Sequence, residues 1–379
     1  MSSPIEVSPA EPAATMRSIL QRIATGPELS KDISREEARL GMRFVLDRAV
    51  DPVQAGIFLI ALRMKRETDE ENLGILEALL EATHTVTATV PELIDIADPY
   101  DGFARTLPAS PFLPAVLAAC GVPAVSHGVE TMGPKYGLTH RQVLAAAGVP
   151  VDLTGEEGAR RLADPGIGWA YLDQKTFCPK LYELAALRTL IVKRPAVTTA
   201  EVLLGPIRGR ARTHVVTGYV HKAYPRVYAL LARRAGFDSA LIVRGVEGGV
   251  IPSLRQASKA FYYRDQGPEQ TADFSPAEFG IDQPVLAPPI PGRGEGDPAD
   301  PAAAHQATPK SDNAALAQAA AQAGLAALGG QPGATRDALV YGAALALFHL
   351  KRNDSLQGAA DAVRSVLDSG LALQRVTRG

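Results

Sequence analysis

The sequence predicts an α/β protein with a small all-helical domain and a large domain, in which helices flank a mainly parallel sheet. Two patterns lead to this prediction. Residues from about 16 to 88 carry apolar side chains at helical spacing between polar capping residues. From Leu93 onward, short apolar runs of strand length alternate with helical stretches. Such alternation is typical of parallel strands joined by helical crossovers.

The helical domain is recognised from its helix starts. Ser34 with Glu37, and Thr68 with Glu71, have the spacing of a capping box, in which two residues bond each other's backbone N–H groups. Between them lie "EARLGMRFVLDRAV" and "PVQAGIFLIALRMK", which are apolar at helical spacing. Residues 1–15 lack the charged start and apolar run of a signal peptide, so we expect a disordered tail there.

The large domain, residues 89–379, contains four apolar runs that we expect to be strands. They are "LIDIA", "PAVSHG", "THVVTGYV" and "ALIVRG". Ligands bind beyond the carboxyl ends of the strands in such sheets, so the loops after these runs are the candidate site loops. Residues from about 284 to 312 are rich in Pro, Gly and Ala and predict a flexible excursion, which C-terminal helices follow.

Composition argues against several classes of protein. The 379 residues are 46% hydrophobic, enough for a large buried core, and the net charge of −2 argues against a polyanion binder by gross charge. Cys120 and Cys178 lie far apart without a CxxC pattern, so we expect no disulfide framework, no structural zinc and a cytoplasmic location. The longest apolar runs fall short of the ~18 residues that a membrane span needs.

The segment "ADPYDGFARTLPAS", from Ala97 to Ser110, lies where an α/β protein places a phosphate-binding loop. Such loops are rich in glycine because backbone N–H groups must approach phosphate oxygens closely. Here Gly102 is the single glycine, while Arg105 is a cation whose forked N–H groups can hold a phosphate. We therefore expect this loop to bind anions through side chains more than through amides.

A local excess of positive charge lies between Glu201 and Asp238, an interval without acidic residues. We define the basic patch as Arg208, Arg210, Arg212, His221, Lys222 and Arg226. The first three alternate along the chain, so an extended segment would carry them on one face, which suits an anionic ligand or a nucleic-acid backbone. The alternative is that some cations in this interval only complement a helix dipole.

Several stretches together resemble anthranilate phosphoribosyltransferase, a family similar in fold to the pyrimidine nucleoside phosphorylases. They are "SREEARLGMRFVLDRAVDPVQAGIFLIALRMKRET", "GVPAVSHG", "LLGP" and the ending "TRDALVYGAALALFHL … SLQGAADAVRSVLDSG". The resemblance runs from about Met16 to the C-terminus. It implies an active site in a cleft between the two domains, and a homodimer formed through the helical domain. It also implies phosphoribosyl pyrophosphate with magnesium, and an aromatic amine, as substrates.

The family's first motifs match this chain in part. Its pyrophosphate loop, Gly-Thr-Gly-Gly-Asp-Gly, corresponds to Ala97–Gly102, where Asp101 and Gly102 agree. Its Asn-Ile-Ser-Thr segment corresponds to Leu107–Ser110, which offers fewer donors and ends in the candidate ligand Ser110.

The second motif of the family, Lys-His-Gly-Asn-Arg followed by a Ser/Gly-rich loop, appears here as "SHGVETMGPKYG". His127, Gly128, Lys135 and Gly137 match it. The arginine that holds the anthranilate carboxylate in the family corresponds to Arg188.

The acidic Asp-Glu pair that holds magnesium in the family corresponds to Val250 and Ile251. Magnesium requires oxygen ligands, which these side chains lack, and Glu247 nearby is one carboxylate in a different register. We therefore expect no standard magnesium site and no cofactor.

Two interpretations of function follow. The first is an enzyme, a pentosyltransferase-type member of this family with an altered donor or substrate. The second is a non-catalytic protein that binds nucleic acid or a nucleotide with the cleft and the basic patch. In that case the chain would resemble a second branch of the family. In either case we expect a ligand with a phosphate or carboxylate group and no catalytic residue is assigned. The residues expected to bind that group are Asp101, Gly102, Arg105, Ser110, His127, Gly128, Lys135, Gly137 and Arg188.

Overall fold

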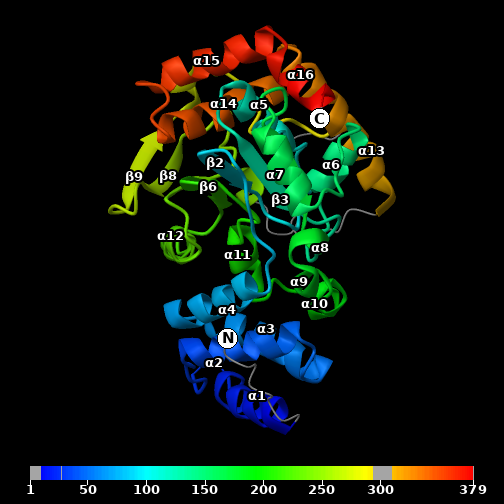
Figure 1. Ribbon diagram of the computed structural model, residues 1–379, viewed down its shortest axis with the longest axis vertical. Helices are drawn as coiled ribbons and strands as arrows, with labels where there is room; N and C mark the ends of the chain where they lie inside the picture. The colour runs from blue at the N-terminus through cyan, green and yellow to red at the C-terminus, as the bar shows by residue number, and fades with distance from the viewer. Residues whose placement is uncertain (1–9, 27, 293–309, 379) are drawn as a thin grey trace.

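The computed structural model describes residues 10–26, 28–292 and 310–378. A helical unit lies at one end of the molecule, a sheet lies in the middle, and the C-terminal helices cover the other end (Figure 1). This architecture confirms the predicted fold class, because a small helical domain precedes an α/β domain whose sheet is mainly parallel.

The N-terminal unit begins with α1 (Ala10–Ile23), α2 (Arg35–Leu46), α3 (Pro52–Lys65) and α4 (Asp69–Glu81). Both expected capping boxes are present, at Ser34 before α2 and at Thr68 before α4. They supply partners for backbone N–H groups that the first helical turn leaves without one.

Helix α1 extends into the segment that we expected to be a disordered tail. Residues 10–15 are helical, because this stretch is rich in alanine and leads into Met16 and Ile19, which are fully buried. Residues 1–9, the rest of that expected tail, lie outside the described residues.

The main sheet has seven strands in the order β4-β3-β2-β6-β7-β8-β9. The strands are β2 (Glu92–Ala97), β3 (Ala124–Gly128), β4 (Trp169–Asp173), β6 (Arg212–Tyr219), β7 (Ser239–Arg244), β8 (Ser258–Tyr263) and β9 (Gln270–Phe274). The strands from β4 to β7 in this order pair in parallel, while β8 and β9 extend one edge in antiparallel fashion. A separate short pair joins β1 (Val86–Thr87) to β5 (Ile207–Arg208).

Strand β2 is the topological switch point of the sheet. The chain goes from β2 to β3 and β4 on one side, and returns to β6 and β7 on the other side. A crevice opens at the carboxyl ends of the strands where the order reverses in this way, and open α/β sheets bind ligands there. The loop after β2, singled out from the sequence, therefore lies at the expected place.

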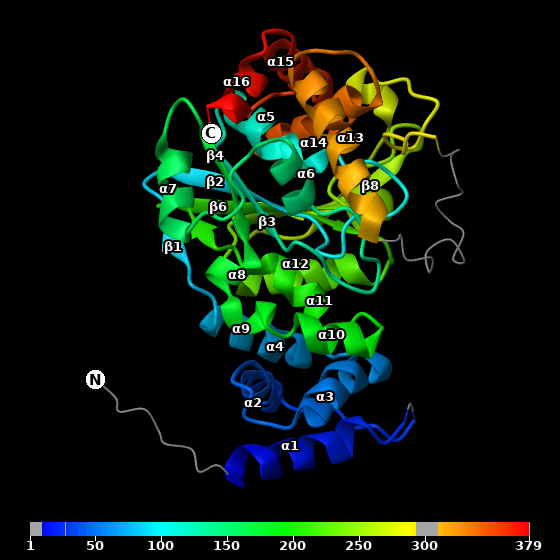
Figure 2. The ribbon, with the colours of Figure 1, turned by 90° about the vertical axis from the view of Figure 1, so that its right-hand side faces the viewer.

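The helices of the large domain cover both faces of the sheet (Figure 2). Those described are α5 (Leu113–Ala119), α6 (His140–Ala146), α7 (Gly155–Ala163), α8 (Gln174–Phe177), α9 (Pro179–Tyr182), α10 (Ala185–Ile191), α11 (Val197–Ala200), α12 (Tyr224–Arg234), α13 (Lys310–Leu328), α14 (Ala334–His349), α15 (Leu356–Asp368) and α16 (Leu371–Thr377). Helix α10 packs on α3 and α11 packs on α4, so segments that follow β4 in the chain add to the helical unit.

One hydrophobic core extends from the helical unit to one face of the sheet. It joins Ile19 of α1 and Leu76 of α4 to Val215 of β6 and Ala240 of β7. A second core, under α5 and α14, covers the opposite face of the sheet.

Three further expectations concern less regular features. The expected excursion at 284–312 lies in part outside the described residues, and α13 begins at Lys310. Cys120 and Cys178 are both free. Within residues 10–26, 28–292 and 310–378, no helix is both long and apolar enough to cross a membrane.

A buried histidine joins the C-terminal helices to the sheet. Nε2 of His349, at the end of α14, lies 3.0 Å from the hydroxyl of Ser239, and Nδ1 of His214 lies 2.8 Å from the same hydroxyl. Burial lowers the pKa of His349 to about 3, with smaller contributions from Arg264 and His214. Burial also lowers the pKa of His214.

We expect His349 to make folding stability depend on pH. Its folded pKa lies below the unfolded value of about 6.5, so the unfolded chain takes up a proton first and stability falls as the pH drops below about 6.5. The variant His349→Gln should show a pH slope smaller by up to about 1.4 kcal/mol per pH unit between about pH 6 and 4. Urea unfolding measures both slopes, with the exposed His84→Gln as control. Equal slopes for His349→Gln and the wild type would contradict this account.

Candidate functional site

Three loops meet at the switch point of the sheet, one after β2, one after β3 and one after β7. Phe103, in the first loop, exchanges backbone hydrogen bonds of 3.0 and 2.7 Å with Leu138 in the second. The ring of Phe103 also packs against Gly249 in the third loop. The candidate site is therefore formed by segments that are far apart in the sequence.

Two of the expected phosphate-binding glycines lie against each other. Gly102 has a φ of +72°, and a Cβ there would come within 2.7 Å of backbone atoms of Gly137. The amide of Gly102 donates to Pro99, and the amide of Gly137 donates to the carbonyl of Asp101 at 2.9 Å. These glycines allow two loops to approach closely, and their N–H groups bond within the protein.

Glu247, in the loop after β7, places a carboxylate on the loop after β2. It accepts the N–H groups of Ala104 and Arg105 at 2.9 Å each, and the hydroxyl of Thr106 at 3.0 Å. Its side chain is 2% exposed, and Nζ of Lys135 lies 3.6 Å away. A carboxylate of the protein thus occupies the donors that this loop presents.

Asp98 is buried at the end of β2 and is fully engaged. One carboxylate oxygen accepts the N–H of Val250 at 2.7 Å. The other accepts the hydroxyl of Ser110 and lies 2.7 Å from Nε2 of His140. Hydrogen bonds from these neighbours therefore stabilise the Asp98 carboxylate, and Ser110 is one of the donors.

Asp101 forms the most open ion pair of the site. It accepts Nε and Nη2 of Arg194 at 2.9 and 2.5 Å, and Nζ of Lys135 lies 3.6 Å from it. The side chain of Arg194 is 48% exposed, whereas that of Lys135 is 12% exposed. Lys135 thus lies between two carboxylates. Nε of Arg105 lies 4.0 Å from the carboxylate of Glu247.

His127 and Gly128 lie within β3 and not in a loop. Nδ1 of His127 is 2.5 Å from the hydroxyl of Tyr100, and Nε2 is 3.0 Å from Asp95. Its side chain is fully buried, so His127 holds the strand ends together. Burial raises the pKa of Tyr100 well above its ordinary value, and the charges of Glu201 and Asp95 add to this effect.

Arg188, expected to bind a substrate carboxylate, is paired with a carboxylate of the protein. Nη1 and Nη2 bond the two oxygens of Glu201 at 2.7 and 2.6 Å, and both side chains are 1% exposed. Gln174 also donates to Glu201, at 3.4 Å. Among the described residues, Nε of Arg188 and the hydroxyl of Tyr171 have no hydrogen-bond partner. Glu201 thus makes the bidentate contact with Arg188 that the carboxylate of a bound ligand would make.

Arg208, the first residue of the basic patch, points into the protein. It donates to the carbonyl of Ala235 at 2.8 Å and lies 4.2 Å from the ring centre of Phe237. Burial lowers its pKa. The chain turns between β5 and β6, so the prediction that Arg208, Arg210 and Arg212 share one face of an extended segment is wrong.

The rest of the basic patch is exposed and partly paired. Arg212 pairs with Asp265 at 3.0 Å, and Arg226 pairs with Asp69 at 2.6 Å. Arg210, His221 and Lys222 lie at the surface. Acidic residues from elsewhere in the chain therefore offset part of the charge that the sequence interval suggested.

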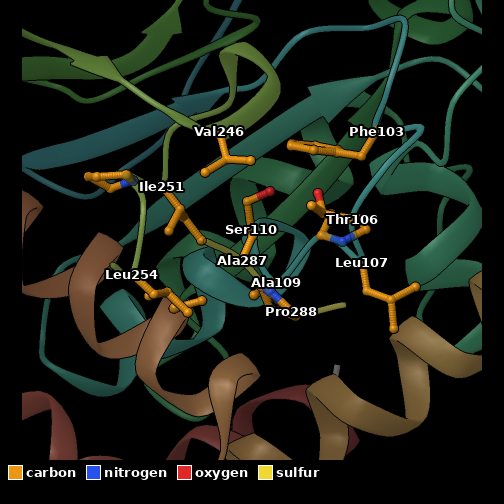
Figure 3. A pocket seen from close by; sticks show the side chains of 13 residues that line it. Phe103, Thr106, Leu107, Ala109, Ser110, Val246, Ile251, Leu254, Ala287 and Pro288 are labelled. Atoms are coloured by element: carbon orange, nitrogen blue, oxygen red, sulfur yellow. The ribbon is translucent and has the colours of Figure 1, made fainter. Parts of the chain in front are cut away.

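A pocket between the loops is lined mainly by apolar side chains (Figure 3). Its volume is about 330 Å³, including the solvent at its mouth. Ile251, at one of the positions of the magnesium acids in the resembling family, faces this pocket with Val246 and Leu254, and Leu107 lines it from the loop after β2. Val250, at the other position, is buried.

These residues do not fit a magnesium ion. The nearby carboxylates of Asp98, Asp101 and Glu247 already accept donors of the protein. Magnesium binds hard oxygen ligands in near-octahedral geometry, which apolar groups cannot complete. In the part of the chain that the structure describes, no group of three or more His, Cys, Asp or Glu side chains is arranged to hold a metal ion.

Comparison with known proteins agrees with this architecture. Residues 17–83 match the helical bundle domain of a glycosyl transferase family, and residues 103–288 match its a/b domain. The chain belongs to this glycosyl transferase family, which confirms the resemblance at the level of the family.

Individual relatives cover most of the chain at low identity. An anthranilate phosphoribosyltransferase of Nitrobacter hamburgensis is 26% identical over 95% of this chain and 96% of its own. An uncharacterised protein of Aquifex aeolicus is 29% identical over 59% of this chain, and the match spans 65% of that relative's length. The solved anthranilate phosphoribosyltransferase of Saccharomyces cerevisiae in complex with PRPP and Mg is 15% identical, covers 96% of both chains and has a TM-score of 0.72.

Among the site residues that were not sequence candidates are two basic side chains, Arg194 and His140. Arg194 follows Arg188 closely in the chain, and His140 opens α6 directly after the capping residue Thr139. A basic residue beside a loop acid, or a histidine behind a helix cap, is too common a pattern to indicate a site. Both became visible only through their contacts with Asp101 and Asp98.

We expect the buried pair of Arg188 and Glu201 to be essential for stability. The variant Glu201→Gln leaves a buried guanidinium without its counter-charge and should lower the free energy of unfolding by about 3–5 kcal/mol. The matched control is Glu183→Gln, which breaks an exposed pair with Arg48 and should cost less than about 1 kcal/mol. Urea unfolding measures both. Similar values for the two variants would show that Arg188 does not depend on Glu201.

Proposed function

We propose that this chain is a pentosyltransferase-type enzyme that acts on a phosphate- or carboxylate-bearing small molecule and has no standard magnesium site. The observation that carries the proposal is the state of the acids at the switch point. Each has its own partner in the protein, and apolar Val250 and Ile251 stand where the resembling family has its magnesium acids. A donor that depends on a bound metal is poorly served by such a site.

The expected chemistry is transfer at an anomeric carbon, in which the bond to an anionic leaving group breaks as a nucleophile attacks. Such a reaction relies on positioning and on stabilisation of the charge that develops on the leaving group. Lys135 and Arg105, whose side chains lie beside the loop after β2, are the cations that we assign to this stabilisation. Arg194 at the open side is a third candidate, since its side chain is partly exposed.

We further propose that anthranilate is not the acceptor. In the resembling family Arg188 corresponds to the arginine that holds the anthranilate carboxylate. Here the carboxylate of Glu201 takes both of its Nη groups. An incoming carboxylate would have to displace Glu201 and leave it buried without a counter-charge, which costs several kcal/mol.

Calorimetry with phosphoribosyl pyrophosphate, with and without magnesium, tests the proposed donor change. We expect no magnesium-dependent binding to the wild type, because the oxygen ligands for the metal are engaged elsewhere. Loss of anthranilate fluorescence in the presence of both substrates measures turnover, and we expect none. Magnesium-dependent binding at micromolar concentration, or growth of a tryptophan auxotroph rescued by this chain, would overturn the proposal.

The exposed apolar side chains of the helical unit support a homodimer. Val53 and Met64 of α3 are 69% and 70% exposed, and Leu190 of α10 is 80% exposed. Because α10 packs on α3, Leu190 lies on the same helix pair as Val53 and Met64 (Figure 2). Exposed apolar surface on a helix pair is characteristic of an interface between protein chains.

We expect a dimer in light scattering at micromolar concentration. The double variant Val53→Lys with Met64→Lys should give a monomer, because it places charges where apolar groups would be buried. The matched control is Val220→Lys, which changes an exposed valine in the loop after β6. A monomeric wild type, or a double variant that remains dimeric, would contradict dimerisation through α3.

A further inference from the structure

The loop after β2 presents a set of donors that is typical of an anion site. The N–H groups of Ala104 and Arg105 and the hydroxyl of Thr106 converge on one small region, which the carboxylate of Glu247 fills. Lys135 approaches the same carboxylate from the loop after β3. Consecutive backbone N–H groups with a nearby cation form the concave sites in which proteins bind phosphate and carboxylate groups.

The backbone conformation of the loop that carries Glu247 places its carboxylate against these donors. Glu247 has a φ of +55°, in the left-handed region that few residues other than glycine adopt readily. Gly245 and Gly249 flank it so tightly that a Cβ on Gly245 would lie 1.6 Å from the carbonyl oxygen of Gly249. A non-glycine residue is therefore held at a costly position, and the hydrogen bonds of its side chain offset that cost.

Two carboxylates surround Lys135, which lies beside these donors. Its ammonium group is 3.6 Å from Glu247 and 3.6 Å from Asp101. Without Glu247, the loop would keep its donors and a nearby cation, but would have lost the acceptor that satisfies them. Buried donors without an acceptor are costly, so such a loop favours an anion from solution.

We infer that residues 104–106 with Lys135 form a subsite for the phosphate or carboxylate group of a ligand, and that Glu247 is its internal occupant. The ligand group and the Glu247 side chain then compete for the same donors. The inference rests on the proposed function for the class of ligand. It adds which atoms bind the anionic group, and it predicts that the wild type binds small anions weakly. Binding of the full ligand requires the Glu247 carboxylate to leave.

The test compares binding of inorganic phosphate to the wild type and to Glu247→Gly. Glycine removes the carboxylate and relieves the positive φ, so this variant keeps the fold. We expect it to bind phosphate about tenfold more tightly than the wild type, measured by ³¹P NMR titration. Addition of Lys135→Ala to Glu247→Gly should abolish that gain. Acetate, titrated by calorimetry, tests whether the subsite also takes a carboxylate.

A control variant separates the subsite from a general effect of charge. Glu278→Gly removes a carboxylate that caps Ser275, outside these three loops, and should leave phosphate binding as in the wild type. An affinity of Glu247→Gly no higher than that of Glu278→Gly would overturn the inference. The wild type and Glu247→Gly could also bind phosphate equally tightly, and both could lose this binding when Lys135→Ala is added. That result would overturn the inference but leave the proposed function intact. Magnesium-dependent binding of phosphoribosyl pyrophosphate by the wild type would instead overturn the proposed function.

Discussion

The need to neutralise buried carboxylates organises this candidate site. Asp98 and Asp101, in the loop after β2, are 2% and 4% exposed, and the side chain of Glu247, in the loop after β7, is equally buried. A buried carboxylate is unfavourable unless charges or hydrogen-bond donors surround it. Each acid accepts at least one donor from another segment, from Val250 to Asp98, from Arg194 to Asp101 and from Ala104 to Glu247. Satisfying the charges therefore also fixes how these segments lie. Stability and site geometry therefore depend on the same contacts.

In this arrangement donors of the protein balance the charge of the acids. Where a metal ion bridges acids and phosphates, the ion supplies most of the positive charge. Here the chain supplies positive charge through Arg194 and Lys135, and further hydrogen bonds come from backbone N–H groups. The chain thus has the fold of its family, and groups of the protein engage the acids at these strand ends.

The architecture could be predicted from the sequence because it depends on local patterns. Capping boxes at Ser34 and Thr68, and the alternation of strands and helices, concern neighbouring residues. The sequence predicted where the site lies but not which side chains contact one another there, since Glu247 bonds Ala104 across 143 residues of chain. His127 was expected to bind an anionic group, but it is buried within β3 and contacts Tyr100 and Asp95. Strands in parallel sheets are buried on both faces, so the sequence gives no alternation that shows where such a polar side chain points. The direction of Arg208 likewise depends on Phe237, which no motif indicates.

The continuous core that joins the helical unit to one face of the sheet limits how the molecule can move. A hinge between the two parts would expose apolar side chains such as Leu76 and Val215, which belong to that one core. Two parts that share a core in this way unfold as one cooperative unit instead of swinging as rigid bodies. The segment with Arg188 and Arg194 lies between them, next to α3 and α4. Adjustment to a ligand is therefore confined to the loops, and changes in the helical bundle reach the site through packing.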